Sequence, residues 1–134
     1  VPYGERAGKI DAALRAVDLY EKRKSRARDL SGGQKQRLAI ARAIVNEPQI
    51  IFADEPTGNL DSETGARVEK LLFGYNKTKG VTLVIVTHDN DLANKCDYQI
   101  SIKDGRIQHS TVPAGGAKET KPVPKKVRVA RNYV

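Results

Sequence analysis

Two adjacent carboxylates, Asp54 and Glu55, directly follow a short apolar run from Ile50 to Ala53. The length and flanks of this run favour a buried parallel strand over a helix, and open α/β sheets bind ligands at the carboxyl ends of such strands. Because neighbouring side chains on a strand point to opposite faces, the two acids should have different roles. We expect Asp54 to hold magnesium and Glu55 to orient and deprotonate an attacking water. An acidic pair after a strand also occurs as an ordinary surface feature.

A glycine-rich segment, Ser31-Gly32-Gly33-Gln34, lies where a second helix should begin. Each glycine in the first turn lowers helix stability by about 0.8–1.0 kcal/mol relative to alanine. Two glycines at this place therefore suggest a role that outweighs this cost. Glycine lets backbone N–H groups approach a ligand closely, and a helix N-terminus attracts anions. Ser31 adds a hydroxyl and is a good N-cap. The segment therefore predicts a phosphate-binding loop, and the alternative is a plain glycine-rich turn before a helix.

Two further polar positions follow the same logic. His88 comes directly after a second apolar run, Val81 to Val86 and Thr87, so it should lie at the same sheet edge as Glu55 and hydrogen-bond a phosphate. A lone histidine is nevertheless more often structural. Asp61 precedes a predicted helix, which it or its neighbour should cap.

The elements that position these residues alternate between helix and strand. Apolar residues recur at helical spacing near the start of the chain, and Asp104-Gly105 is a strong two-residue hairpin turn. The order predicts an α/β domain with a mainly parallel sheet flanked by helices and a C-terminal hairpin. The expected elements are helices over 8–20, 31–46, 62–75 and 91–95, strands over 50–53 and 81–86, and a hairpin from 98 through Ile107.

Together, these motifs resemble the C-terminal portion of the ATP-binding domain of an ABC transporter. Leu30–Gln34 matches the family signature, Ile50–Glu55 the Walker B strand with its catalytic glutamate, Gly58–Asp61 the D-loop, and His88 the switch histidine. The string Ala53–Gly65 further resembles the lipoprotein-release and macrolide-export type. The resemblance implies a P-loop NTPase-like fold, ATP and Mg²⁺ as cofactors, and an ATPase that drives a membrane transporter.

The resemblance also implies where each residue acts. In the family, two ATP-binding domains pair head to tail, and the signature loop of one domain contacts the ATP of the other. The expected partners are therefore a second nucleotide-binding domain, as a homodimer, and a transmembrane permease. This places the protein in the cytoplasm, on the inner face of the membrane. The signature loop (Ser31, Gly32, Gly33, Gln34) and Asp61 would act across the interface, whereas Asp54, Glu55 and His88 would serve the ATP of their own subunit.

The 134 residues do not contain the phosphate-binding motif of such an ATPase, G-x-x-x-x-G-K-S/T. We therefore expect residues 1–109 to form an incomplete ABC ATPase domain that lacks its P-loop half. Its helical and signature part would cover 1–48, and the part from the Walker B strand to the hairpin 49–109. A first residue that is not methionine favours an N-terminally truncated sequence, inactive alone. The missing strand would leave an open apolar edge and a poorly soluble product.

The net charge of +8 is concentrated toward the ends of the chain, and residues 110–134 carry six basic groups and one acidic group. We expect this stretch to be a basic flexible tail. Two alternatives stay open: a non-transport ABC protein acting on nucleic acid or ribosomes, and a non-catalytic half-domain that docks on a P-loop partner. The tail has one aromatic residue, Tyr133, and so no stacking series; no specific nucleic acid is expected.

Overall fold

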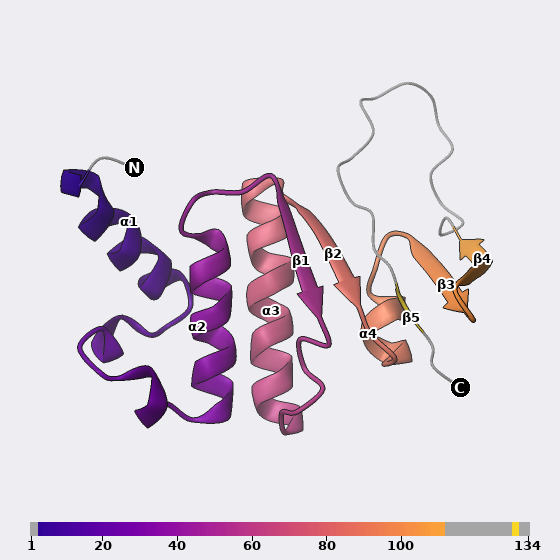
Figure 1. The fold of residues 1–134 in the computed structure, drawn as a ribbon, viewed down its shortest axis with the longest axis horizontal. Coiled ribbons are helices and arrows are strands. Elements are labelled where there is room, and N and C mark those ends of the chain that lie inside the picture. Colours follow the sequence, from indigo (N-terminus) through magenta and orange to yellow (C-terminus); the bar gives the residue numbers. More distant parts are fainter. Residues whose placement is uncertain (1–2, 112–129, 132–134) are drawn as a thin grey trace.

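The computed structural model of the chain describes residues 3–111 and 130–131, and it confirms the α/β class (Figure 1). The observed order of helices and strands matches the predicted order, and an additional short strand follows it. The elements are α1 (Tyr3–Ala16), the 3₁₀ turns η1 (Tyr20–Lys22) and η2 (Ala27–Asp29), α2 (Gly32–Ile44), β1 (Ile50–Asp54), α3 (Ser62–Lys79), β2 (Thr82–Val86), α4 (Asn90–Asn94), β3 (Gln99–Lys103), β4 (Arg106–Thr111) and β5 (Ala130–Arg131).

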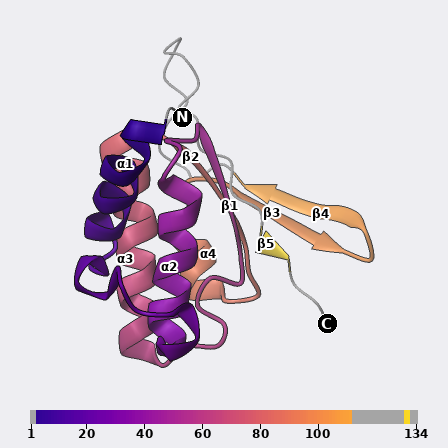
Figure 2. The same ribbon diagram turned by 60° about the vertical axis from the view of Figure 1, so that its left-hand side comes forward.

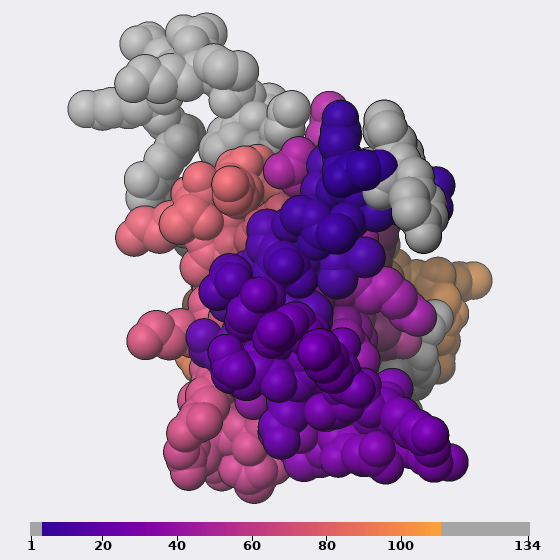
Figure 3. Space-filling model, turned by 90° about the vertical axis from the view of Figure 1, so that its left-hand side faces the viewer, coloured from indigo at the N-terminus to yellow at the C-terminus, as the bar shows by residue number. Residues whose placement is uncertain are grey.

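The first helix begins and ends earlier than the apolar spacing predicts. Asp18 adopts a left-handed backbone with φ 56°, and the Leu19 N–H turns back to donate to the Leu14 carbonyl at 2.8 Å. This turn ends α1, yet it keeps Leu14, Val17 and Leu19 in the core. Figure 3 shows that α1 covers the outside of the helical layer, with α3 at one side of it.

The helices α2 and α3 lie side by side against one face of the β1–β2 sheet (Figures 1 and 2). Their apolar stripes meet the inward side chains of both strands in one continuous core, as the helical spacing of these residues requires. α3 runs one turn further than expected and ends where Gly80 takes the left-handed conformation, φ 65°, as helix-terminating glycines often do. The central members of this core are Ile40, Ile44, Ile51, Val68, Leu72, Leu83 and Ile85.

The strands β1 and β2 pair in parallel, in a register that runs from Ile50 opposite Thr82 to Asp54 opposite Val86. The prediction of a buried strand is wrong for one face of β1. Ile51 is buried, but Ile50 is 51% exposed and Phe52 is 77% exposed. The reason is that the described residues supply two strands to this sheet and place their helices on one side of it.

This exposed face gives a first prediction. The polypeptide of 134 residues on its own should scatter light and bind a hydrophobic dye, because large exposed apolar groups promote association. Phe52→Thr should reduce both signals while changing the free energy of unfolding by no more than about 0.5 kcal/mol, since the side chain is exposed. Ile107→Thr, which alters a 68% exposed residue of the hairpin, is the matched control. A monodisperse parent polypeptide would contradict this prediction. Equal reductions by Phe52→Thr and Ile107→Thr would show that the exposed face of β1 is not the source of the two signals.

The hairpin turn has the predicted chemistry. Asp104 and Gly105 both have positive φ, 50° and 71°, which is the requirement of a type I′ turn. β4 extends to Thr111, beyond the predicted return, and β5 pairs with β3 in parallel. The predicted tail therefore contributes its first two residues to β4 and Ala130–Arg131 to β5. The rest of the tail, residues 112–129 and 132–134, lies outside the described residues. None of the helices in the described part of the chain has both the length and the apolar character that a bilayer crossing needs.

Candidate active site

Glu55 lies immediately after β1 in an unusual backbone conformation. Its φ is 44°, in the left-handed region, which costs roughly 1–2 kcal/mol for a residue with a side chain. The Glu55 N–H still donates to the Val86 carbonyl of β2 at 2.8 Å, and the Glu55 carbonyl accepts from the Gly58 N–H at 3.2 Å. The chain thus leaves the sheet sharply at this residue. Strain held at the carboxyl end of a strand is typical of functional positions.

The carboxylate of Glu55 meets the end of β2. Its Oε1 accepts from the backbone N–H of His88 at 3.0 Å and lies 2.8 Å from Nδ1 of the same residue. Its Oε2 accepts from the Thr87 hydroxyl at 3.3 Å. Parallel pairing of the two strands brings these groups together although more than thirty positions separate them in the chain. The structure therefore places two of the predicted site residues in direct contact.

Thr87 is a site residue to which the sequence analysis gave no role. It is 2% exposed, and its hydroxyl accepts the Asp89 N–H at 3.0 Å while donating to Glu55. The available signal was a hydroxyl residue at the end of an apolar strand, beside a histidine. Because threonine is also a common strand residue, that signal alone could not separate packing from function.

Asp54 is exposed at the last position of β1, beside Glu55. Mg²⁺ prefers hard oxygen ligands, keeps several waters, and is usually held by one or two carboxylates together with substrate phosphates. An exposed carboxylate at a strand end fits that pattern. The described residues contain no group of three or more His, Cys, Asp or Glu side chains that could hold a metal ion.

The signature loop forms the start of α2, as predicted. Ser31 is the N-cap: its Oγ accepts the Gln34 N–H at 3.3 Å, and the Gln34 Oε1 accepts the Ser31 N–H at 3.0 Å. These reciprocal bonds form a capping box. The Lys35 N–H bonds to the Ser31 carbonyl, so Gly32 and Gly33 carry the two N–H groups at this end that have no partner among the described residues. Two open N–H groups at a helix N-terminus can receive an anion.

Gly33 also has a packing role that the sequence did not indicate. A side-chain carbon built on Gly33 would overlap the methyl group of Thr64 in α3, whereas the same carbon on Gly32 would meet no atom within 4 Å. Thr64 is β-branched and therefore stiff in a helix. The missing side chain at Gly33 lets the beginnings of α2 and α3 pack closely.

This packing yields a second prediction. In the full-length protein, Gly33→Ala should lower the free energy of unfolding by about 1–3 kcal/mol through overpacking, although alanine favours a helix. Gly32→Ala, the matched control, should be neutral or stabilising. Thr64→Ser removes the overlapping methyl and should restore much of the loss in the Gly33→Ala background. Denaturant unfolding gives the free energy of unfolding of the parent, Gly33→Ala, Gly32→Ala and the double variant Gly33→Ala/Thr64→Ser. Equal losses of stability at Gly32 and Gly33 would show that the contact with Thr64 does not cause the loss.

Asp61 is the N-cap of α3. Its Oδ1 accepts the Thr64 N–H at 3.0 Å, and this bond holds the pKa of the Asp61 carboxyl below its usual value. The capping interpretation of this residue is therefore supported. The carboxyl end of β1 and the beginnings of α2 and α3 all lie toward the lower edge of Figure 1. Within the described residues, no hydrogen bond or ion pair links the signature loop to Glu55 or His88.

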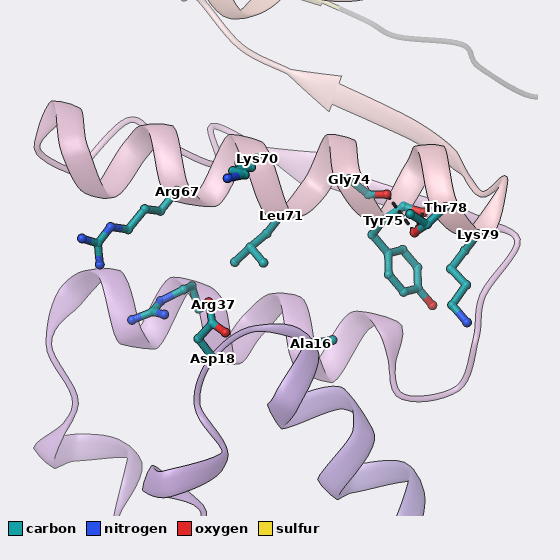
Figure 4. Close-up of a pocket in the computed structure, with 10 residues that line it drawn as sticks. All are labelled: Ala16, Asp18, Arg37, Arg67, Lys70, Leu71, Gly74, Tyr75, Thr78 and Lys79. Carbon is teal, nitrogen blue, oxygen red and sulfur yellow. Dashed lines mark hydrogen bonds between the residues drawn. The ribbon is translucent and has the colours of Figure 1, made fainter.

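A surface groove lies away from these residues. A groove of about 630 Å³ separates α3 from α2 and the end of α1, and it contains none of the predicted site residues (Figure 4). Arg67, Lys70 and Lys79 of α3 and Arg37 of α2 line it. Arg67 is paired with Glu63 at 2.6 Å, and Arg37 donates to the Val17 carbonyl at 3.2 Å. These bonds hold two of the four basic side chains, Arg67 and Arg37, against the fold.

The chain is similar in sequence and fold to known proteins. Residues 4–58 match the family model described as ABC transporter. The chain is 46% identical over 99 residues to the lipoprotein-releasing system ATP-binding protein LolD of Syntrophus aciditrophicus, an alignment covering 74% of this chain and 44% of that protein. It is 50% identical over 94 residues to the LolD of Anaeromyxobacter dehalogenans, covering 70% of this chain and 39% of the relative.

Solved structures of ABC transporter cassettes are also similar to this chain. The dimeric structure of MJ0796, a bacterial ABC transporter cassette, is 40% identical with a TM-score of 0.73, over 87% of this chain and 50% of that one. The structure of cbiO1 from Clostridium perfringens, part of the ABC transporter complex cbiONQ, is 35% identical with a TM-score of 0.76, over 84% of this chain and 45% of that one.

The fold and the strand-end site thus define part of an ABC-type ATP-binding cassette. The chain matches the ABC transporter family model over residues 4–58, and the relatives that it resembles include ATP-binding proteins of the LolD type. It spans about half, or somewhat less, of the length of the relatives that it matches.

Proposed function

We propose that this chain is the signature and Walker B part of the ATP-hydrolysing subunit of a membrane transporter of the LolD type. The observation that carries the proposal is the contact of Glu55 with His88 at the carboxyl ends of two parallel strands, beside the exposed Asp54. ATP hydrolysis by the full-length subunit, and its loss when Glu55 is replaced by glutamine, tests this function.

Glu55 is the general base in this proposal. A carboxylate offers about four lone-pair directions, and three are taken by the His88 N–H, the His88 ring and the Thr87 hydroxyl. One direction stays open for a water molecule, and the other three hold the carboxylate still. A positioned base of this kind accelerates hydrolysis by about 10²–10⁴-fold.

His88 has two functions in the proposed mechanism. Its Nδ1 faces Glu55, so in the presence of an ionised carboxylate this nitrogen carries the proton. The ring is 68% exposed, which leaves Nε2 accessible to a ligand. Nε2 can donate to a phosphate only in the doubly protonated imidazolium.

Asp54 would hold Mg²⁺, which when bound neutralises charge on the phosphate oxygens. The position suits this role because the side chain is exposed at the sheet edge where Glu55 lies. Binding of the phosphates requires a P-loop, and the 134 residues do not contain this motif. Residues 1–109 therefore act as part of a larger ATPase domain, and residues 110–134 as a basic extension of it.

The signature loop acts on a second subunit in this proposal. Its side chains are engaged in the capping box, which leaves the Gly32 and Gly33 N–H groups for the phosphates of an ATP bound by the partner. The relative MJ0796 has been solved as a dimer, and also as a dimer in a post-hydrolysis state with ADP and Pi. The proposal therefore includes a homodimer of the full-length subunit that couples ATP binding to a permease on the inner face of the cell membrane, and the dimer of this relative supports the pairing.

A further inference from the structure

We propose that Thr87 is a positioning residue that fixes the Glu55 carboxylate for hydrolysis, an inference that rests on the proposed ATPase function. Thr87 is buried, and its hydroxyl is the one group within the described residues that donates to Oε2 of Glu55, at 3.3 Å. Its own backbone belongs to the segment that carries His88. The hydroxyl therefore connects the strained end of β1 to the end of β2.

The direction of the Thr87 proton is set by a second bond. A hydroxyl has one donor and accepts at its oxygen. The Asp89 N–H already donates to this oxygen at 3.0 Å, which leaves the O–H proton for the carboxylate. Asp89 in turn caps α4 through the Asp91 and Leu92 N–H groups. The donor is thus held in place by the helix that follows.

Glu55 needs this second anchor because His88 binds only one of its oxygens. Both His88 donors meet Oε1, so without Thr87 the carboxylate could rotate about that oxygen. The Glu55 side chain is 34% exposed and is not confined by packing alone. With Oε2 held as well, the plane of the carboxylate is fixed, and so is the lone pair left for water. The hydroxyl therefore orders the base without touching the substrate.

A purely structural role makes different predictions. Thr87→Val keeps the shape and loses the hydroxyl, whereas Thr87→Ser keeps the hydroxyl and loses a buried methyl. If Thr87 serves packing, the serine variant should be affected at least as much as the valine variant. If it positions Glu55, the serine variant should stay close to the parent and the valine variant should not.

The test uses the full-length subunit and measures kcat and KM for ATP. Thr87→Val should lower kcat about tenfold, as expected for one lost hydrogen bond to a charged group, with little change in KM. Thr87→Ser should stay within about threefold of the parent. In the Glu55→Gln background, Thr87→Val should cause no further loss, because the residue acts through Glu55.

Three results would overturn the positioning role while leaving the ATPase assignment intact. They are a parent-like kcat in Thr87→Val, an equal loss of kcat in Thr87→Ser, or an equally large further loss when Thr87→Val is added to Glu55→Gln. A parent subunit that hydrolyses no ATP would overturn the proposed function itself, and with it this role. Unfolding midpoints are measured in parallel. If the valine variant does not fold, Thr87→Cys takes its place, and its weaker donor should give an intermediate kcat.

Discussion

Replacing Glu55 with glutamine in the full-length subunit is expected to lower kcat for ATP hydrolysis by about a hundredfold or more. The amide is nearly the same size as the carboxylate, but it cannot take a proton from water. It also offers a single acceptor oxygen to the donors of His88 and Thr87, which bind both oxygens in the parent. ATP-induced pairing of two subunits should persist, because the change removes no group from the signature loop.

The measurements are steady-state ATP hydrolysis and the mass of the protein in solution with and without ATP. Glu21→Gln is the matched control, since Glu21 is exposed in η1, outside the site. It should leave both readings unchanged. An undiminished kcat in Glu55→Gln would remove Glu55 from the role of general base.

The second large effect is expected from Ser31→Arg. The long side chain would fill the space in front of the open Gly32 and Gly33 N–H groups, and the change removes the Oγ that accepts from Gln34. Arginine also places a positive charge at the positive end of the α2 dipole. Pairing with ATP should be lost, and hydrolysis with it, while each subunit still binds ATP at its own P-loop.

Light scattering in the presence of ATP measures the pairing of subunits, and nucleotide-binding titrations measure ATP binding by each subunit. Ser25→Arg, at another exposed serine, is the matched control for the added charge. Ser31→Ala isolates the loss of the cap, which should cost about 1 kcal/mol of stability and leave pairing largely intact. Pairing that survives Ser31→Arg would contradict a signature loop that acts across a subunit interface.

Local chemistry made several of these features predictable. The Asp104-Gly105 turn, the Ser31 cap and the Asp61 cap each follow from the conformation or hydrogen bonds of a few neighbouring residues. The meeting of Glu55 and His88 follows from a simple rule, because the ends of neighbouring parallel strands share one sheet edge. The roles given to these residues remain predictions that the experiments above would test.

Other features depend on tertiary packing and could not be read from the sequence. The overlap that forbids a side chain at Gly33 involves Thr64, some thirty positions away. The early end of α1 depends on a left-handed residue that is not glycine, Asp18. The exposure of Phe52 depends on which layers cover the sheet rather than on the strand's own residues.

The capping box at the start of α2 has a consequence for kinetics. The bonds between Ser31 and Gln34 order the loop within a single chain, before any nucleotide or second subunit is present. A surface that is already in its binding conformation loses little conformational entropy on association. Two subunits loaded with nucleotide would then join at a rate set by diffusion and orientation rather than by slow rearrangement of this loop.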